Sequence, residues 1–337
     1  MILKQDGSVW SCGLNANGQL GIDSFMYKSN LFELAISNGV VAIAAGTSHS
    51  VVLKQDDSVW ITGSQLQIDD VHEFSLIQSI NGAKTAAAGS RHCMVLSQSG
   101  SVWARGWNRY GQLGDKTYVD KSGFVLVMSS GATAVATGHL HSIVLKEDGS
   151  VWATGWNKNG QLGDMVLSIG RSSFVKVTSR AKAVAAGGDH SLVLKRDGTV
   201  WATGWNEYGQ LGDGTTTSRH VYCQVLRSSK AIAAGTRHSM VLKQDGSVWT
   251  AGYNQYGQLG GRFSGTERSK FVRVISSGAE AMAAGGAHSM VFKHDGTVWA
   301  AGSNRYGQIG YGKAQDNVKR FVVVYEGEIH DAIASHR

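Results

Sequence analysis

The stretch HSLVLKRDGTVWATG, residues 190–204, decides the fold of this chain. It contains two runs rich in β-branched and large apolar residues, with the dipeptide Asp197-Gly198 between them. Asp-Gly between two such runs is a strong hairpin signal, because glycine accepts the positive φ of a type I′ turn without steric cost. The stretch therefore predicts two antiparallel strands joined by a tight turn.

The same pattern recurs along the whole chain and ends each time in the dipeptide Val-Trp. The seven tryptophans follow one another at intervals of 43 to 50 residues: Trp10, Trp60, Trp103, Trp152, Trp201, Trp249 and Trp299. A period of this length is typical of repeat architectures, and one unit is too short to bury its own apolar face. We therefore expect residues 1–337 to form one domain in which seven units share a ring.

Each unit has room for four short strands. Between Trp152 and Trp201, residues 174–177 (FVKV) are typical of a short strand, residues 183–187 are small and apolar, and the hairpin of residues 190–204 follows. Four strands in each of seven units predict an all-β protein, a seven-bladed β-propeller of four-stranded blades.

The two ends of the chain complement each other. Residues 332–336 (AIASH) resemble the start of an internal unit, residues 231–235, and residues 3–10 (LKQDGSVW) supply the continuation. We therefore expect the ring to be closed by a blade shared between the N- and C-termini. Removing the last 15 or so residues should then lower the melting temperature sharply.

The composition limits the classes of function. The 337 residues include 44 glycines and no proline, so glycine, asparagine, aspartate and serine must form the turns. The three cysteines are odd in number and far apart, which predicts neither a disulfide framework nor a zinc site. The net charge of +7 permits an acidic partner, but no block of like charges indicates nucleic acid by itself.

A second motif, Gly-x-Asn-x-x-Gly-Gln-Leu-Gly, follows six of the seven tryptophans with small variations. Its asparagines are Asn15, Asn108, Asn157, Asn206, Asn254 and Asn304. Together with the patterns A-x-x-A-G-x-x-H-S and L-K-x-D-G-x-V-W, this motif resembles the repeats of the regulator of chromosome condensation family. The resemblance covers essentially the whole chain and implies a seven-bladed propeller.

What the resemblance implies for function depends on which relative is considered. One relative is an exchange factor that opens a small nuclear GTPase with a protruding loop and binds nucleosomes partly through a basic tail. Here the segments after the GQLG turns run only 10 or 11 residues to the next strand, and we expect no tail outside the repeats. Another relative is an ultraviolet photoreceptor, whose light-sensing tryptophans lie just before the repeated histidine, a slot without tryptophan in this chain.

Six histidines recur at one position of the repeat: His49, His92, His141, His190, His238 and His288. Equivalent atoms of a propeller lie too far from a common centre for the short bonds of a zinc site. We therefore expect each histidine to link adjacent strands by hydrogen bonds. No catalytic motif is present, so the sequence predicts no enzymatic activity, no catalytic residues, no cofactor and no metal.

Three groups of residues are candidates for binding another protein. The first is a trio of additional tryptophans, Trp107, Trp156 and Trp205. The second is a band of mostly aromatic residues at the first strand of each unit, represented by Phe124, Phe174, Phe271 and Phe321, with Leu31 in the first unit. The third comprises basic residues three places before the band, Lys28, Lys121, Arg171, Arg219 and Arg268. Packing between blades is the alternative for the aromatic groups, and a solvated rim is the alternative for the basic group.

The unit after Trp60 lacks the Asn-Gly-Gln turn, which predicts a notch on the rim at residues 64–70. From these features we predict a non-enzymatic interaction platform or a scaffold subunit of a larger assembly, with another protein as its partner. The alternatives are a guanine-nucleotide exchange factor for a small GTPase and a chromatin-binding propeller.

Overall fold

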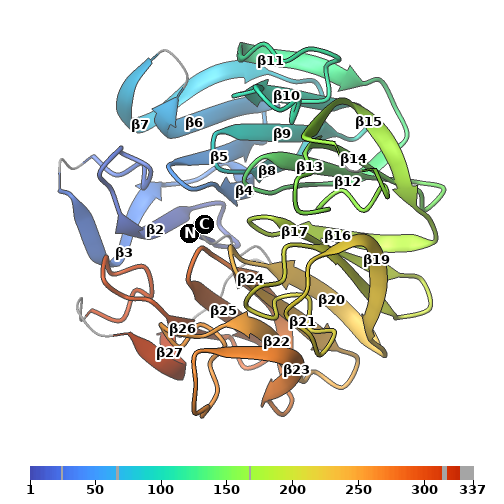
Figure 1. Cartoon of the computed structure of the whole chain (residues 1–337). Helices are drawn as coiled ribbons and strands as arrows, with labels where there is room; N and C mark the ends of the chain where they lie inside the picture. The colour runs from blue at the N-terminus through green and yellow to red at the C-terminus, as the bar shows by residue number, and fades with distance from the viewer. Residues whose placement is uncertain (24–25, 66–67, 167, 313–316, 327–337) are drawn as a thin grey trace.

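The computed structural model describes residues 1–23, 26–65, 68–166, 168–312 and 317–326. The regular secondary structure of these ranges consists of β-strands, and these strands form seven antiparallel sheets around a common axis (Figure 1). In the described ranges, no helix is long and apolar enough to cross a membrane. The predicted fold class, an all-β seven-bladed propeller, is confirmed.

We number the sheets as blades 1 to 7 in chain order. Blade 1 contains β1 (Ile2–Leu3), β2 (Val9–Leu14) and β3 (Lys28–Ile36). Blade 2 contains β4 (Val40–Ala45), β5 (His49–Lys54), β6 (Ser58–Gln65) and β7 (Ile68–Ser79). Blade 3 contains β8 (Ala83–Ala88), β9 (His92–Ser97), β10 (Val102–Gly106) and β11 (Lys121–Met128). Blade 4 contains β12 (Ala132–Thr137), β13 (His141–Lys146), β14 (Val151–Trp156) and β15 (Gly170–Thr178).

The remaining blades repeat this order. Blade 5 contains β16 (Ala181–Ala186), β17 (His190–Lys195), β18 (Val200–Gly204) and β19 (Arg219–Leu226). Blade 6 contains β20 (Ser229–Ala234), β21 (His238–Lys243), β22 (Val248–Tyr253) and β23 (Glu267–Ile275). Blade 7 contains β24 (Ala279–Ala284), β25 (His288–Lys293), β26 (Thr297–Gly302) and β27 (Val318–Glu326).

Blade 1 differs from the other six because it has three described strands instead of four. The strand that we expect to complete it, residues 332–336, lies outside the described residues. A blade shared between the two termini therefore stays a prediction.

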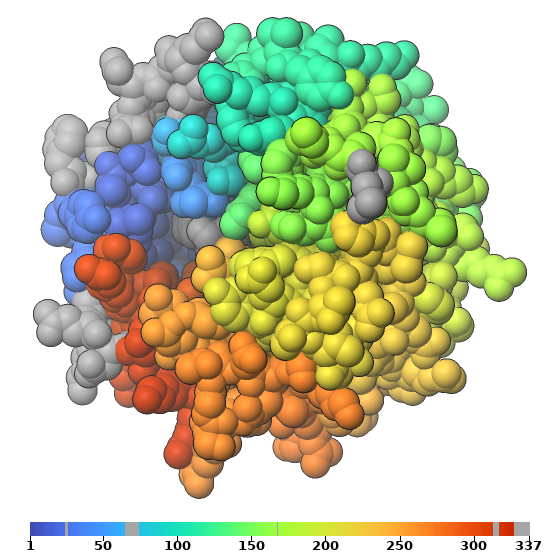
Figure 2. Space-filling model, viewed as in Figure 1, coloured from blue at the N-terminus to red at the C-terminus, as the bar shows by residue number. Residues whose placement is uncertain are grey.

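The residues nearest the axis are small. The first strands of blades 2 to 7 line a narrow central channel of about 240 Å³, mostly with alanine side chains. The second strands, such as β17, are almost completely buried between the sheets. Side chains fill most of the space between the blades, as the space-filling view shows (Figure 2).

The Asp-Gly hairpins form at the predicted places, but their turn is of a different type. In blade 5, the Gly198 N–H donates to the Lys195 carbonyl at 3.0 Å, and Gly198 has a φ of +80°. Asp197 does not have the positive φ that a type I′ turn requires, and its carboxylate accepts the Thr199 N–H at 2.9 Å. The connection is therefore a type I turn followed by a glycine bulge.

The repeated tryptophans are half-buried. The Trp201 indole N–H donates to the Thr199 hydroxyl, and the Lys195 ammonium lies 4.2 Å from the centre of the ring. Blades 1, 2, 4, 6 and 7 have an equivalent lysine 3.8 to 4.8 Å from the ring centre. Each of these tryptophans thus packs one face in the blade and shields the other with a lysine.

The repeated histidines link neighbouring blades, which agrees with the hydrogen-bonding role predicted for them. His190 Nε2 lies 2.9 Å from the hydroxyl of Ser239 in blade 6. That hydroxyl donates its one proton to the Gln210 carbonyl, at 2.6 Å, in the turn of blade 5. Nε2 therefore carries a hydrogen and donates it to the serine oxygen. The pairs His92–Ser142, His141–Ser191 and His238–Ser289 are built in the same way.

Blade 2 lacks the Asn-Gly-Gln turn, and β6 and β7 pair directly up to Gln65 and Ile68. The notch predicted at residues 64–70 falls partly outside the described residues. Blade 3, which follows the missing turn, has a different residue at the position that contacts this turn in other blades. Thr154 and Thr203 donate to the turn of the preceding blade, but blade 3 has Arg105 at the equivalent position, only 3% exposed and 5.9 Å from the Phe124 ring.

Candidate protein-binding face

The Asn-Gly-Gln turns are rigid platforms at one face of the ring. In blade 4 the buried Asn157 accepts the Leu162 N–H through its side-chain oxygen at 3.0 Å. Its side-chain nitrogen donates to the Asp164 carboxylate at 2.8 Å and to the Val166 carbonyl at 2.9 Å. One amide thus fixes both the turn and the loop after it, so residues on the turn have defined positions.

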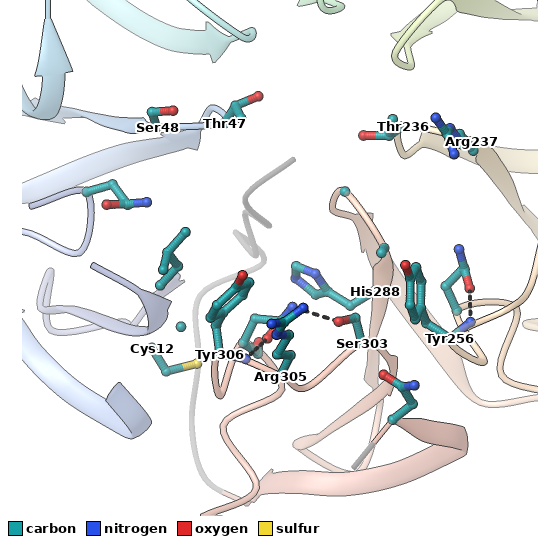
Figure 3. A pocket seen from close by; sticks show the side chains of 18 of the residues that line it. Cys12, Thr47, Ser48, Thr236, Arg237, Tyr256, His288, Ser303, Arg305 and Tyr306 are labelled. Carbon is teal, nitrogen blue, oxygen red and sulfur yellow. Dashed lines mark hydrogen bonds between the residues drawn. The ribbon is translucent and has the colours of Figure 1, made fainter. Parts of the chain in front are cut away.

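A pocket of about 820 Å³ opens among these turns (Figure 3). Its wall comes from blades 1, 2, 6 and 7 and includes many residues with polar side chains. The side chains labelled in Figure 3 include Thr47, Ser48, Thr236, Arg237, Tyr256, Arg305 and Tyr306. The pocket therefore brings together residues that lie far apart in the sequence.

Arg237 is the centre of an aromatic cluster beside this pocket. Its guanidinium lies 5.4 Å from the ring centre of Trp205, 5.1 Å from that of Tyr208 and 5.8 Å from that of Tyr253. Tyr208 is tilted against Tyr253, with the ring centres 4.7 Å apart. Tyr256 follows at 6.0 Å from Tyr253 and is 37% exposed. The Arg237 cluster, as we call these five residues, spans blades 5 and 6.

A carboxylate lies close to the cluster. Burial raises the pKa of Asp189, although a hydrogen bond from Gln161 and the positive charge of Arg237 act in the opposite direction. Gln161 Nε2 donates to the Asp189 carboxylate at 3.2 Å. The arginine thus has three aromatic rings within 6 Å and the charge of a partly desolvated acid nearby.

The predicted tryptophan trio falls into two groups. Trp107 and Trp156 both contact Tyr110, with ring centres 5.5 and 4.4 Å apart, and form a second cluster across blades 3 and 4. Trp205 belongs to the Arg237 cluster instead. All three side chains are half-buried, so each packs in its blade and still exposes part of its ring.

The aromatic band packs between blades and does not form an exposed surface. Phe124, Phe271 and Phe321 are at most 9% exposed, and Phe174 packs against the core of blades 3 and 4. Most of these rings lie against the last glycine of the GQLG turn in the preceding blade. A Cβ on Gly212, for example, would lie 2.3 Å from the Phe271 ring. In blade 1 the equivalent residue is Phe32 and not Leu31, because the Phe32 ring contacts Gly310.

The predicted basic group is largely engaged within the loops. Lys121, Arg171 and Arg219 pair with the aspartate after the turn of their own blade, at 3.4, 2.8 and 2.7 Å. Lys28 donates to the Arg305 carbonyl, and Arg268 donates to the Glu267 and Ser264 carbonyls. Partial burial tends to raise the pKa of Asp213, but hydrogen bonds from Thr215 and Arg219 hold it below its usual value. These contacts make the group a weaker site for an acidic partner than the sequence suggests.

Sequence reasoning missed most of the Arg237 cluster. A signal was present, because tyrosine occupies the second position after the turn asparagine in four units, at Tyr110, Tyr208, Tyr256 and Tyr306. Arginine directly precedes the repeated histidine in two units, at Arg91 and Arg237. Comparing the seven units position by position identifies these residues, but only the structure shows that they meet.

Comparison with known families identifies the repeat. The sequence model of the Regulator of chromosome condensation (RCC1) repeat matches residues 6–53, 99–145, 148–194 and 197–242, more than half of the chain. A second model of this repeat matches residues 84–112, 132–161, 181–210, 230–258 and 280–308. No curated protein sequence matches the chain significantly.

Solved structures share the fold at low sequence identity. Human WBSCR16 superposes with a TM-score of 0.85 at 23% identity, and the match covers 94% of each chain. Prp20p from Saccharomyces cerevisiae, described together with its binding to Gsp1p and histones, has a TM-score of 0.83 at 20% identity. That match covers 97% of this chain and 88% of Prp20p. At these identities the similarity establishes the fold alone.

Proposed function

This chain belongs to the regulator of chromosome condensation repeat family, and from that premise we propose that it is a non-enzymatic platform that binds another protein. The Arg237 cluster is the proposed docking site. The observation that carries the proposal is the gathering of one arginine, one tryptophan and three tyrosines on the turn face of blades 5 and 6. These three residue types dominate the binding energy of protein interfaces.

The chemistry of the repeated His–Ser pairs favours a binding role over catalysis. A serine beside a histidine is the arrangement of a nucleophile and its base, but here the serine donates its proton to a backbone carbonyl. His190 and Ser239 have no exposed surface, so a substrate cannot reach them. In the described residues, no group of three or more histidine, cysteine, aspartate or glutamate side chains could hold a metal ion.

A comparison of two arginine variants tests the proposal. We expect Arg237→Ala to lose the partner in affinity capture with mass spectrometry, because the variant removes the centre of the aromatic cluster. Arg273→Ala is the matched control, since Arg273 is exposed on β23 of the same blade but opposite Trp249 and away from the turns. Equal recovery of the same proteins by both variants and the wild type would argue against this docking site.

The exchange-factor alternative has a direct assay. Nucleotide release from a panel of small GTPases should be unaffected by this chain if it is only a platform. The connection between β2 and β3 in blade 1 and the connections between the third and fourth strands of blades 3 to 7 span similar lengths of sequence, 13 to 15 residues. Strong acceleration of nucleotide release would replace the platform proposal. The chromatin alternative predicts salt-dependent binding to nucleosomes, which the platform proposal does not require.

A further inference from the structure

Two neighbouring loops expose apolar side chains that the fold does not bury. In the loop of blade 4, Met165 is 77% exposed, Val166 46% and Ile169 71%. In the loop of blade 3, Tyr118 is 55% and Val119 63% exposed. We call these five residues the apolar tips. Scattered exposed apolar residues are common, but a group on adjacent loops marks an interaction site.

The two loops are held side by side. The Lys116 N–H donates to the Ser172 carbonyl at 2.8 Å, and Asp115 forms a β-bridge with Ser173. The blade 3 loop therefore packs along the start of β15, directly after Ile169. The apolar tips consequently lie on two neighbouring loops of blades 3 and 4.

The loop of blade 5 shows that the fold does not require these apolar side chains. It has the same anchoring, since Asn206 donates to the Asp213 carboxylate at 3.2 Å and to the Thr215 carbonyl at 3.0 Å. Its sequence is nevertheless polar, with Gly214-Thr215 where blade 4 has Met165-Val166. Met165 even adopts a φ of +64°, a left-handed conformation that favours glycine. An exposed methionine at a strained position points to a role outside folding.

Several backbone polar groups of the apolar tips are satisfied inside the protein. The Met165 N–H donates to the His220 carbonyl, and the Val166 N–H donates to the Asp164 carboxylate. The Val166 and Ile169 carbonyls accept hydrogen bonds from Asn157. In blade 3, the Thr117 and Val119 carbonyls accept hydrogen bonds from the Asn108 side chain. Loops whose backbone is already paired can enter a water-poor interface without losing hydrogen bonds.

The charges around the apolar tips are mainly positive. Lys116, Lys158 and Arg109 are exposed on the same two loops. Of the nearby carboxylates, Asp115 and Asp164 are neutralised by Lys121 and Arg171, and Asp120 accepts the Asn108 N–H. The whole chain has a net charge of +7, so the field favours an anionic surface.

We propose that the apolar tips insert into the surface of an anionic lipid bilayer and attach this propeller to a membrane. Aliphatic side chains on paired loops need no complementary shape in hydrocarbon, whereas the energy of protein interfaces comes mainly from tryptophan, tyrosine and arginine. The lysines beside the tips add electrostatic attraction to acidic headgroups. The half-exposed Trp107 and Trp156 on the same face are residue types that favour the headgroup region.

Vesicle co-sedimentation tests this proposal with the full chain. We expect binding to phosphatidylcholine vesicles that contain about a third phosphatidylserine, and much weaker binding to pure phosphatidylcholine. The variant Met165→Gly, Val166→Thr, Ile169→Ser carries the residue types of the blade 5 loop and should fold normally. Its affinity for the anionic vesicles should fall at least tenfold. Lys116→Gln and Lys158→Gln should each weaken binding about fivefold at low salt.

The control is Leu126→Gln, which replaces another exposed apolar residue, 49% accessible on β11, by the neutral residue type of blade 5 at that position. It should bind vesicles like the wild type. Absence of binding to anionic vesicles, or equal binding by the loop variant, would overturn the proposal. If the wild type instead self-associates and the loop variant is monomeric, the apolar tips contact a second copy and the membrane proposal fails.

Discussion

At the scale of single residues, the repeat allows the backbone conformation at one position to be compared between blades. Asp57 has a φ of +65° at the end of the hairpin turn of blade 2. The equivalent residues of the other blades are glycines with positive φ: Gly7, Gly100, Gly149, Gly198, Gly246 and Gly296. A side chain in the left-handed region costs about 1–2 kcal/mol, and the entropy of an added glycine offsets part of the gain. We therefore predict that Asp57→Gly raises the free energy of unfolding by about 0.5–1 kcal/mol in urea titrations.

The reverse change in another blade is the control for this prediction. A Cβ on Gly246 would lie 2.9 Å from the Gly278 nitrogen, so Gly246→Ala should destabilise the protein. A lower stability for Asp57→Gly would mean that the aspartate side chain contributes more than the turn geometry costs.

Residue patterns in the sequence predicted where turns, hairpins and histidines lie better than they predicted how exposed a side chain is. The Asn-Gly-Gln turns, the hairpins and the linking histidines follow from local chemistry, and they form where the repeat places them. The exposure of Phe271 depends instead on Gly212 in the preceding blade, and that of Trp201 depends on Lys195 above its ring. Such contacts between units are set by packing, which the periodicity does not specify.

At the scale of elements, the buried repeated histidines should make stability depend on pH. Burial lowers the pKa of His49 and of His238 to about 4, and the charge of Arg105 adds to the effect at His49. The unfolded chain has the usual histidine pKa of about 6.5, so between about pH 6.5 and 4 it binds more protons than the native state. The free energy of unfolding should therefore fall as the pH falls through this window, by on the order of 3 kcal/mol for each histidine. Urea titrations at pH 7.5, 6.0, 5.0 and 4.5 measure this slope.

His238→Gln isolates one of these links. Glutamine keeps a donor for the Ser289 hydroxyl but does not titrate, so the variant should show a shallower decline between pH 6.5 and 4. The exposed hairpin aspartates, such as Asp6 and Asp148, have pKa values lowered mainly by hydrogen bonds from the following serines, so they act at lower pH. A decline as steep as in the wild type would show that His238 is not one of the groups that titrate.

Blade 2 and its neighbour show a limit of predicting structural elements from the sequence. The deletion after Trp60 is visible in the sequence, and it correctly indicates a missing turn. The matching change in blade 3 could not be interpreted from the sequence alone. Arg105 and Cys93 stand where other blades have a threonine and a serine that contact the turn of the preceding blade. Burial raises the pKa of the Cys93 thiol to about 12, so it stays neutral in this packed position.

At the scale of the whole molecule, the count of units determined the fold but not the sites. Seven repeats at similar intervals indicate a ring, and the ring brings Trp205 of blade 5 against Arg237 of blade 6. The apolar tips likewise combine two loops whose neighbourhood depends on blade packing. The proposed binding surfaces therefore arise where neighbouring repeats meet, because one unit supplies only some of the residues.

Closure of the ring gives the last prediction. In blades 2 to 7 the strand nearest the axis lines the channel, but among the described strands of blade 1, β1 pairs only with β2. Because the sequence of residues 332–336 resembles that of the inner strand of blade 6, we expect truncation after Glu326 to leave β27 intact but blade 1 open. Its melting temperature, measured by circular dichroism, should fall by about 4–7 °C, which corresponds to roughly 3–5 kcal/mol for a chain of this length. The full-length variant Ile333→Asp should show most of this loss, since it keeps the chain length and places a charge in the expected strand. If both proteins melt like the wild type, the ring is closed without this segment.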